Sequence, residues 1–312
     1  MIITLTANPS VDRTLQVPKI RFNEILRTNK ARLDWGGKGF NVSRALRVID
    51  YNSLALAWVG GGTGRMLENG LNKLGITTDF VWVEEETRTN TLAREEDGEW
   101  YIRLNEPGPH IPPHSVELLF EKSRSYARGG DIWVVSGSLP QDVDDNFYAE
   151  MITMLKDNDV RVFFDSSGEP FKKGLESRPF LVNLDVDDAE NNFGFAIRNY
   201  EDAKRAALIL LRQEVEYIAI WLYEQGLLLA TQHEMFLAVP PKIRPRGVTG
   251  TRDALMAGLV HGFESRLPLI EVARWGAAYA AAWRAQDAFS TITREDIASF
   301  LPRVDTRVVS TL

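Results

Sequence analysis

Short apolar segments alternate with amphipathic segments along most of the chain. The apolar segments are rich in β-branched and aromatic residues, as buried strands are, and the amphipathic segments repeat their apolar positions every three to four residues. Strands are expected at 2–5, 54–59, 132–135, 161–165, 180–182 and 217–221, and helices at 65–74, 115–127, 147–156 and 201–213. This alternation predicts an α/β fold, with a mostly parallel sheet covered by helices on both faces.

Two stretches depart from the alternation and predict a second, smaller sheet. Residues 14–34 have no helical period, and strand-like runs lie at 80–83 and 91–104, the second of them broken by a turn that ends at Gly98. We therefore expect one α/β domain over the whole chain of 312 residues. The strands of a small lid would come from about 14–34 and 86–106.

Composition and charge narrow the classes of protein. The 44% of hydrophobic and 25% of charged residues are typical of a globular domain, and the net charge of −7 argues against a general nucleic-acid surface. The absence of cysteine excludes disulfides and cysteine-ligated zinc. No stretch approaches the ~18 apolar residues of a membrane span, and the N-terminus has no signal-peptide pattern. We expect a cytoplasmic protein without nucleic-acid or membrane partners.

The stretch from Gly247 to Gly258 predicts a loop that enters a helix. Gly250 suits a tight turn, and the Ala-Leu-Met-Ala run after Asp253 has high helix propensity. A helix start presents unpaired N–H groups and a positive dipole end, which suit a phosphate beside a proton-accepting Asp253. The same pattern is typical of a capping aspartate, and the stretch by itself favours that simpler interpretation.

Two polar loops follow near the N-terminus. Asp12 is expected in a loop from Asn8 to Arg13 that leaves the first strand, where it would either bind substrate hydroxyls or be solvated. Glycines around Lys38 open into a helix and suit an anionic or polyhydroxylated ligand, unless they form only a turn. The spacing is not that of a Walker A loop, because Gly39 stands where Ser or Thr is required.

Seven motifs, in this order, resemble the PfkB sugar kinase family of ribokinase-like fold. They are Asn8-Pro9-Ser10-Val11-Asp12, Gly36-Gly37-Lys38-Gly39-Phe40-Asn41-Val42-Ser43, Glu86-Thr87-Arg88-Thr89-Asn90, Pro107-Gly108-Pro109, Ser136-Gly137-Ser138-Leu139-Pro140, Asp165-Ser166-Ser167-Gly168-Glu169 and the Gly250 to Gly258 segment. The likeness is greatest to the 1-phosphofructokinase and tagatose-6-phosphate kinase branch. The resemblance implies a three-layer fold with a β lid, and transfer of the γ-phosphate of ATP to a fructose or tagatose phosphate.

The resemblance also assigns roles to the sugar side of the site. The positions that match substrate-binding residues are Asp12, Gly37, Lys38, Asn41, Arg88, Arg103 and Gly137. The two arginines would bind the phosphate that the substrate already carries, a role that suits guanidinium forks, with Lys38 assisting. Asp253 matches the catalytic base, and the backbone of Gly250, Thr251 and Arg252 would receive the charge that develops during transfer.

The nucleotide side departs from the family pattern at two motifs. Where the family has Lys-Pro-Asn-x-x-Glu, this chain has Asn183 at the lysine position and the carboxylates Asp185 and Asp188, which suit Mg²⁺. Where the family has Ser-x-Gly-x-x-Gly beside the nucleotide, this chain has Trp221 and Tyr223 at the first and third positions. Their side chains would fill part of the nucleotide groove. Gly226 keeps the last glycine of that motif.

A third departure is Arg252, which stands where the family has glycine. Its side chain either points at the transferred phosphate and helps, or its Cβ distorts the loop that receives charge.

Two functions therefore stay open. One is an active kinase with ATP and Mg²⁺ as cofactors, and the other is a weak or inactive relative that binds a sugar phosphate as a sensor or interaction module. A kinase with another donor or acceptor is a third alternative. Arg103 slightly favours a 6-phosphate, although the sequence does not separate the fructose and tagatose phosphates. By resemblance, exposed lid strands also allow a homodimer.

Overall fold

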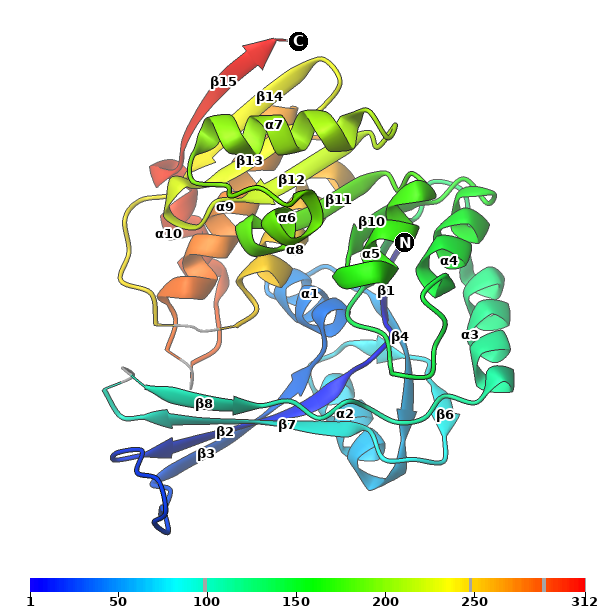
Figure 1. Cartoon of the computed structure of the whole chain (residues 1–312), viewed down its shortest axis with the longest axis vertical. Helices are drawn as coiled ribbons and strands as arrows, with labels where there is room; N and C mark the ends of the chain where they lie inside the picture. Colours follow the sequence, from blue (N-terminus) through cyan, green and yellow to red (C-terminus); the bar gives the residue numbers. More distant parts are fainter. Residues whose placement is uncertain (98–99, 247–248, 288–289, 312) are drawn as a thin grey trace.

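Two sheets form the frame of the protein (Figure 1). The structure is a computed structural model that describes residues 1–97, 100–246, 249–287 and 290–311. The expected turn at Gly98 and the first two positions of the stretch from Gly247 lie outside the described residues.

The larger sheet is parallel at its centre and antiparallel at one edge, with the strand order β15-β14-β13-β12-β11-β10-β9-β1-β4-β5. Its parallel strands are β1 (Ile2–Thr6), β4 (Leu54–Gly60), β5 (Thr77–Thr78), β6 (Val81–Val83), β9 (Ile132–Ser136), β10 (Arg161–Asp165), β11 (Leu181–Asp185) and β12 (Tyr217–Trp221). The antiparallel edge consists of β13 (Leu227–Ala230), β14 (Glu234–Val239) and β15 (Asp305–Thr311). The predicted α/β fold is confirmed.

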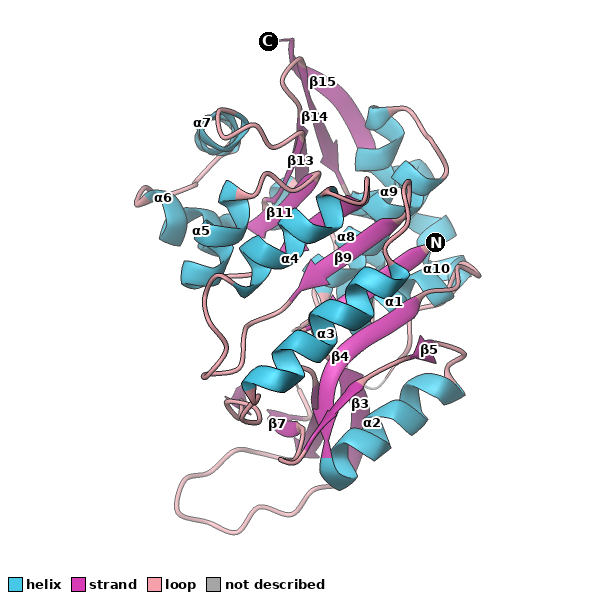
Figure 2. Ribbon diagram, turned by 90° about the vertical axis from the view of Figure 1, so that its right-hand side faces the viewer, coloured by secondary structure: helices cyan, strands magenta, loops and turns pink. Residues whose placement is uncertain are grey.

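Helices cover both faces of this sheet (Figure 2). One face packs against α3 (Pro113–Tyr126), α4 (Phe147–Lys156), α5 (Gly168–Glu176), α6 (Val186–Phe193) and α7 (Tyr200–Leu211). The other packs against α1 (Lys38–Arg47), α2 (Gly61–Lys73), α8 (Thr251–Glu264), α9 (Leu269–Ala285) and α10 (Arg294–Phe300). None of the helices in the described ranges is long and apolar enough to cross a membrane.

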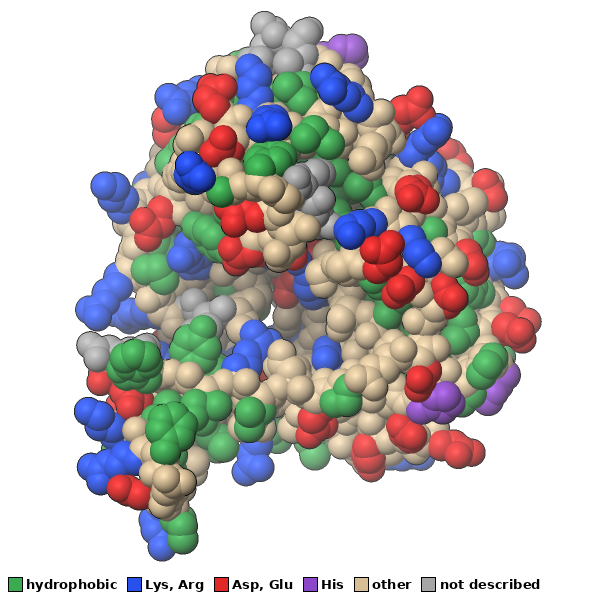
Figure 3. Space-filling model, viewed as in Figure 1, with side chains coloured by type: hydrophobic (Ala, Val, Ile, Leu, Met, Phe, Trp, Pro, Cys, Tyr) green, Lys and Arg blue, Asp and Glu red, His purple; other side chains and the backbone are tan. Residues whose placement is uncertain are grey.

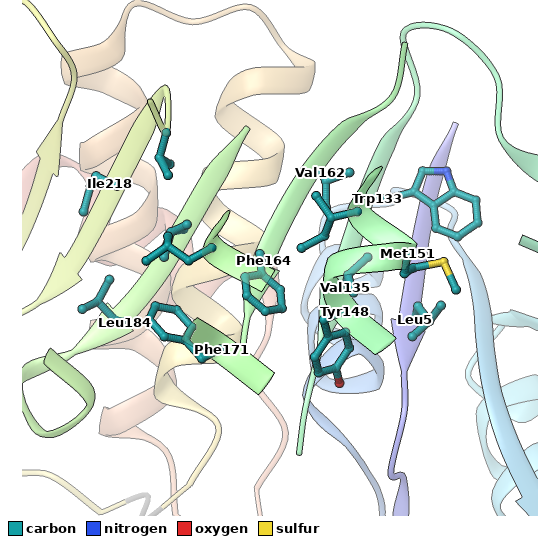
Figure 4. Close-up of a cluster of buried hydrophobic side chains, with 14 of the residues drawn as sticks. Leu5, Trp133, Val135, Tyr148, Met151, Val162, Phe164, Phe171, Leu184 and Ile218 are labelled. Carbon is teal, nitrogen blue, oxygen red and sulfur yellow. The ribbon is translucent and has the colours of Figure 1, made fainter. Parts of the chain in front are cut away.

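Alternate residues of the central strands supply the two halves of the core. In β9, Trp133 and Val135 belong to the cluster drawn in Figure 4, whereas Ile132 and Val134 pack on the opposite face. Successive side chains of a strand point to opposite faces, so a strand covered on both sides is apolar at every position. This explains the continuous apolar runs in the sequence.

The smaller sheet has the order β3-β2-β7-β8 and lies beside one end of the large sheet (Figure 1). Its strands are β2 (Ser10–Val17), β3 (Lys30–Gly36), β7 (Arg88–Glu95) and β8 (Tyr101–Leu104). The expected loop around Asp12 is therefore wrong. Asp12 lies within β2, because Asp34 of β3 and Asn90 of β7 pair with it on either side.

Two further expectations are corrected. The helix expected at 65–74 starts earlier, since α2 begins at Gly61, where the N–H groups of Gly62 and Thr63 donate to the Glu86 carboxylate at 2.9 and 2.8 Å. Such a carboxylate stabilises a helix start. The strand expected at 80–83 does not join the smaller sheet, since β6 pairs with β4 of the large sheet.

Candidate active site

A cavity of about 590 Å³ lies between the carboxyl ends of the central strands and the small sheet. Figure 3 shows it as a hollow where Lys, Arg, Asp and Glu side chains meet. Most of the predicted site residues line it: Asp12, Gly37, Lys38, Asn41, Arg88, Arg103, Gly137, Asp185, Asp188, Trp221, Tyr223, Gly250, Thr251, Arg252 and Asp253. Ligands of open α/β sheets bind at this end of the strands.

Asp253 lies in the first turn of α8, with its side chain at the cavity. Gly250 is the residue before the helix, with a φ of 83°, and a Cβ there would lie 2.8 Å from Nε1 of Trp283. Asp253 is thus not the N-cap residue. It is only 6% exposed, and Asn41 Nδ2 donates to its Oδ2 at 2.8 Å. The simpler interpretation as a capping aspartate does not hold.

The surroundings of Asp253 make its carboxylate unusually basic. Burial raises its pKa to about 6, a shift that nearby Asp165 increases and that Lys38, Arg252 and the hydrogen bond from Asn41 oppose. A carboxylate with such a pKa is still ionised at neutral pH, yet it accepts a proton more readily than an ordinary aspartate. The geometry and the pKa suit a general base.

Arg252 is the second residue of α8 and has a helical backbone, so its Cβ does not distort the loop. Its guanidinium points into a group of carboxylates. Nε and Nη2 donate to Asp165 at 2.9 and 2.7 Å, and Nη1 lies 3.0 Å from Asp185 Oδ2 and pairs with Asp188. Arg252 therefore follows neither of the two expected alternatives: the loop is intact, and the guanidinium is bound to carboxylates.

Asp165 joins these groups, although it was not among the predicted site residues. Its side chain is 3% exposed and also contacts Lys38 Nζ at 2.5 Å and Asn183 Nδ2 at 3.1 Å. Burial disfavours its charge, but Arg252 and Lys38 outweigh burial and hold the pKa of Asp165 below its ordinary value. Its position at the carboxyl end of β10, where α/β ligands bind, was the signal that could have identified it.

The small sheet supplies hydrogen-bonding groups and two arginines. The Asp12 carboxylate accepts from Ser10 Oγ at 2.7 Å and from Asn90 Nδ2 at 2.9 Å. Arg88 donates to the Asn8 carbonyl at 2.7 Å, and Arg103 donates to Asn105 Oδ1 at 3.1 Å. Together with Lys38, the arginines bring three cationic side chains to this side of the cavity, a set that suits an anionic ligand.

Bulky side chains fill the opposite side. Trp221 is 2% exposed, and Tyr223 Oη donates to Asp187 Oδ2 at 2.9 Å. The Arg284 guanidinium lies 5.9 Å from the centre of the Tyr223 ring. Beside these residues, a further cavity of only about 20 Å³ is also lined by Pro240. Trp221, Tyr223 and Arg284 line both this small cavity and the large one.

Two predicted site residues do not line the large cavity. Asn183 is fully buried, and its Nδ2 donates to Asp165 and, at 3.3 Å, to the Arg252 carbonyl. Gly226 lies where a Cβ would be 2.3 Å from the Ala238 carbonyl oxygen. Both positions support neighbouring backbone segments, and their contact with a nucleotide stays a prediction.

Comparison with known protein families matches residues 5–291 to the description "pfkB family carbohydrate kinase". The chain belongs to this family. Members are enzymes that transfer a phosphoryl group to a hydroxyl of a carbohydrate, so the resemblance noted in the sequence is confirmed.

Relatives of this pfkB kinase extend over nearly its whole length. It is 31% identical over 304 residues to a 1-phosphofructokinase of Bacillus subtilis, with 97% of this chain and 98% of the relative covered. It is 29% identical over 308 residues to a 1-phosphofructokinase of Escherichia coli, with 97% of both covered. These names support a sugar-phosphate kinase.

Solved structures share the fold. A possible 1-phosphofructokinase of Thermotoga maritima gives a TM-score of 0.89 at 27% identity, with 99% of this chain and 100% of the other covered. Phosphofructokinase-2 of Escherichia coli in complex with fructose-6-phosphate gives 0.86 at 24% identity, with 96% and 98% covered. The ribokinase-like fold that the motifs implied is thus confirmed.

The expected magnesium ligands of this pfkB kinase have other partners. The Asp185 carboxylate accepts from the Asp188 N–H at 2.9 Å at the start of α6, and both carboxylates pair with Arg252. Across the described ranges, no set of three or more His, Cys, Asp or Glu side chains is arranged to hold a metal ion. Although the donor types suit Mg²⁺, the arrangement does not fit direct coordination by Asp185 and Asp188.

Proposed function

We propose that this pfkB kinase is an ATP-dependent 1-phosphofructokinase, which transfers the γ-phosphate of ATP to a hydroxyl of fructose 1-phosphate. The observation that carries this proposal is the buried Asp253, whose pKa of about 6 suits a base and whose side chain faces the cavity beside the start of α8. The names of the relatives support the sugar.

Each side of the cavity has a distinct part in the proposed reaction. Asp12 and Asn41 bind sugar hydroxyls, and Arg88 and Arg103 bind the phosphate of the substrate. Asp253 accepts the proton of the attacking hydroxyl while α8 holds that hydroxyl in line with the donor. The first N–H groups of α8 lack intrahelical partners and stabilise the charge that develops on the transferred phosphoryl group.

The preference for fructose 1-phosphate departs from the slight preference for a 6-phosphate that Arg103 gave in the sequence. Arg88 is anchored to the Asn8 carbonyl at the end of the small sheet near the main body, whereas Arg103 lies on the edge strand β8. We assign the principal phosphate contact to Arg88 and a supporting contact to Arg103. The names of the relatives reported above give no support for tagatose 6-phosphate.

ATP turnover over a panel of sugar phosphates tests the proposal. ADP release is measured with fructose 1-phosphate, fructose 6-phosphate and tagatose 6-phosphate as acceptors, at saturating Mg·ATP. We expect the highest kcat/KM for fructose 1-phosphate. A preference for either 6-phosphate would overturn the assignment of the substrate while leaving the kinase in place.

A specific observation favours the alternative of a sugar-phosphate-binding module. The bulky side chains of Trp221 and Tyr223 line the predicted nucleotide side, whereas the sugar side has the complete set of predicted residues. Calorimetry with Mg·ATP and with fructose 1-phosphate separates the two functions. Retained sugar binding without ATP binding at about 1 mM, and without turnover, would support the module.

We further propose that the chain is a single domain in which the small sheet acts as a lid over the substrate. The edge strand β8 exposes Leu104, which is 63% exposed, and open strand edges favour pairing with another chain. A homodimer that pairs lid with lid would cover this apolar residue.

A further inference from the structure

Three carboxylates from different parts of the chain converge on the Arg252 side chain. Asp165 ends β10, Asp185 ends β11, and Asp188 lies in the first turn of α6. The Arg252 side chain is 13% exposed, and the carboxylate side chains are 3%, 23% and 18% exposed in the same order. The group therefore lies at the floor of the cavity, largely shielded from solvent.

Every nitrogen of the guanidinium is occupied by these contacts. Nε and Nη2 form a two-pronged contact with Asp165, while Nη1 is shared by Asp185 and Asp188. A guanidinium has five N–H groups and cannot lose its charge in a protein. Burial alone would lower the pKa of Arg252, but Asp165 and Asp185 raise it above its ordinary value. The side chain is thus a permanent cation fixed in one orientation.

The backbone of Arg252 is fixed as well. It belongs to the first turn of α8, and its carbonyl accepts from Asn183 Nδ2 at 3.3 Å. A divalent ion bound by the three carboxylates would have to displace the guanidinium from all of them. Lys38 is a second cation at the group, and its Nζ contacts Asp165 Oδ1, the oxygen that Arg252 Nη2 also contacts.

We propose that the Arg252 guanidinium is a built-in cation. It occupies the place among Asp165, Asp185 and Asp188 that a directly coordinated divalent metal ion would otherwise take. As a positioning residue, it ties the ends of β10 and β11 and the start of α6 to the first turn of α8, next to Asp253. The inference concerns the site of the proposed function, but its test needs neither ATP nor a sugar.

Removal of the guanidinium should create a metal site where the wild-type chain has none. Mn²⁺ is titrated into the nucleotide-free chain and free Mn²⁺ is followed by electron paramagnetic resonance. The wild type should bind no stoichiometric Mn²⁺ below about 1 mM. In R252G the three carboxylates are free of the guanidinium and can close on an ion, so this variant should bind one Mn²⁺ per chain at least about tenfold more tightly than the wild type. Adding D188N to R252G should remove this binding. R284Q, which removes another arginine of the cavity, is the matched control and should gain none.

Two results would overturn the inference. One is wild-type binding of one Mn²⁺ that D185N abolishes, and the other is a folded R252G chain that binds no Mn²⁺. If R252G folds only when Mn²⁺ is present, the ion has taken over the part of the guanidinium, which supports the inference. If R252G does not fold in either condition, the wild-type titration with D185N decides.

Discussion

At the residue scale, different contacts give the two buried carboxyl groups of Asp253 and Asp165 opposite pKa shifts. Asp253 accepts one hydrogen bond from Asn41, and burial raises its pKa to about 6. Asp165 is just as deeply buried, but direct contacts with Lys38 and Arg252 lower its pKa. When two nearby carboxyl groups have pKa values shifted in opposite directions, they can serve different purposes. Asp253 can accept a proton, whereas Asp165 stays negatively charged.

The pH dependence of turnover follows from the raised pKa of Asp253. A base must be deprotonated to act, so kcat/KM should be constant above pH 7 and fall about tenfold per pH unit below about 6. Asn41→Ala removes a hydrogen bond that lowers this pKa, so the inflection in kcat/KM should move to higher pH. Activity that stays level down to about pH 5 would show that the titrating base is not Asp253.

The stability of the chain should depend strongly on Asp165. Asp165→Asn leaves Lys38 and Arg252 with less counter-charge in a buried site, and we expect a loss of about 3–5 kcal/mol in the free energy of unfolding. Denaturant unfolding measures the change. Asp50→Asn breaks the exposed ion pair with Arg294 and should cost less than about 1 kcal/mol. An equal loss of unfolding free energy in the two variants would show that the buried ion pairs of Asp165 contribute no more than an exposed one.

At the element scale, the start of α8 decides where Asp253 lies. Gly250 takes a left-handed conformation against Trp283, whose Nε1 donates to the Thr249 carbonyl at 2.7 Å. The first intrahelical bond runs from Ala254 N–H to the Gly250 carbonyl at 2.9 Å. A shift of this turn would move both the helix N–H groups and the Asp253 carboxylate.

Gly250→Ala should therefore lower kcat by more than its loss of folding stability accounts for. Both the left-handed backbone and the contact with Trp283 oppose a Cβ, so we expect kcat to fall at least about tenfold, the order of effect that displaced catalytic groups produce. Gly194→Ala is the matched control, because Gly194 is also left-handed at a helix end but has open space around a Cβ. The control should lower the melting temperature and leave kcat unchanged, and an equal loss of kcat in both variants would contradict this account.

The elements with a strong period of their own could be predicted from the sequence. The helix Phe147–Lys156 and the strand Tyr217–Trp221 match the expected ranges. The errors fall where distant residues decide, as at α2, which Glu86 stabilises, and at Asp12, which two neighbouring strands pair. Motifs likewise predicted most of the cavity lining, but the carboxylate contacts of Arg252 depend on side-chain direction, which spacing does not give.

At the scale of the whole molecule, the cavity requires both sheets. The large sheet presents the ends of β10 and β11 with α8, and the small sheet presents Arg88 and Arg103 opposite them (Figure 1). The small sheet is open at both edges in the described part of the chain, since its order ends in β3 and β8. Because the small sheet lies over the cavity, it can act as a lid, and because its edges are open, it can pair with a second chain.

The proposed homodimer predicts a change of oligomeric state. Leu104→Glu places a charge on the β8 edge and should convert a dimer into a monomer in light scattering coupled to size exclusion. Leu118→Glu, on α3, changes a residue that is 47% exposed and should leave the dimer intact. A wild-type chain that is monomeric at all concentrations, or a dimer that survives Leu104→Glu, would contradict pairing through the lid.

The central claim is that Asp253 is the base of a sugar-phosphate kinase, and single-turnover transfer tests it most directly. Labelled γ-phosphate of ATP is followed onto fructose 1-phosphate with wild type, Asp253→Asn and the cavity control Asp187→Asn, while calorimetry measures sugar-phosphate binding by each. We expect transfer by the wild type and by Asp187→Asn. Asp253→Asn should bind the sugar phosphate with similar affinity and transfer about 10²–10⁴-fold more slowly. Transfer by Asp253→Asn at the wild-type rate, or none by the wild type, would contradict the account.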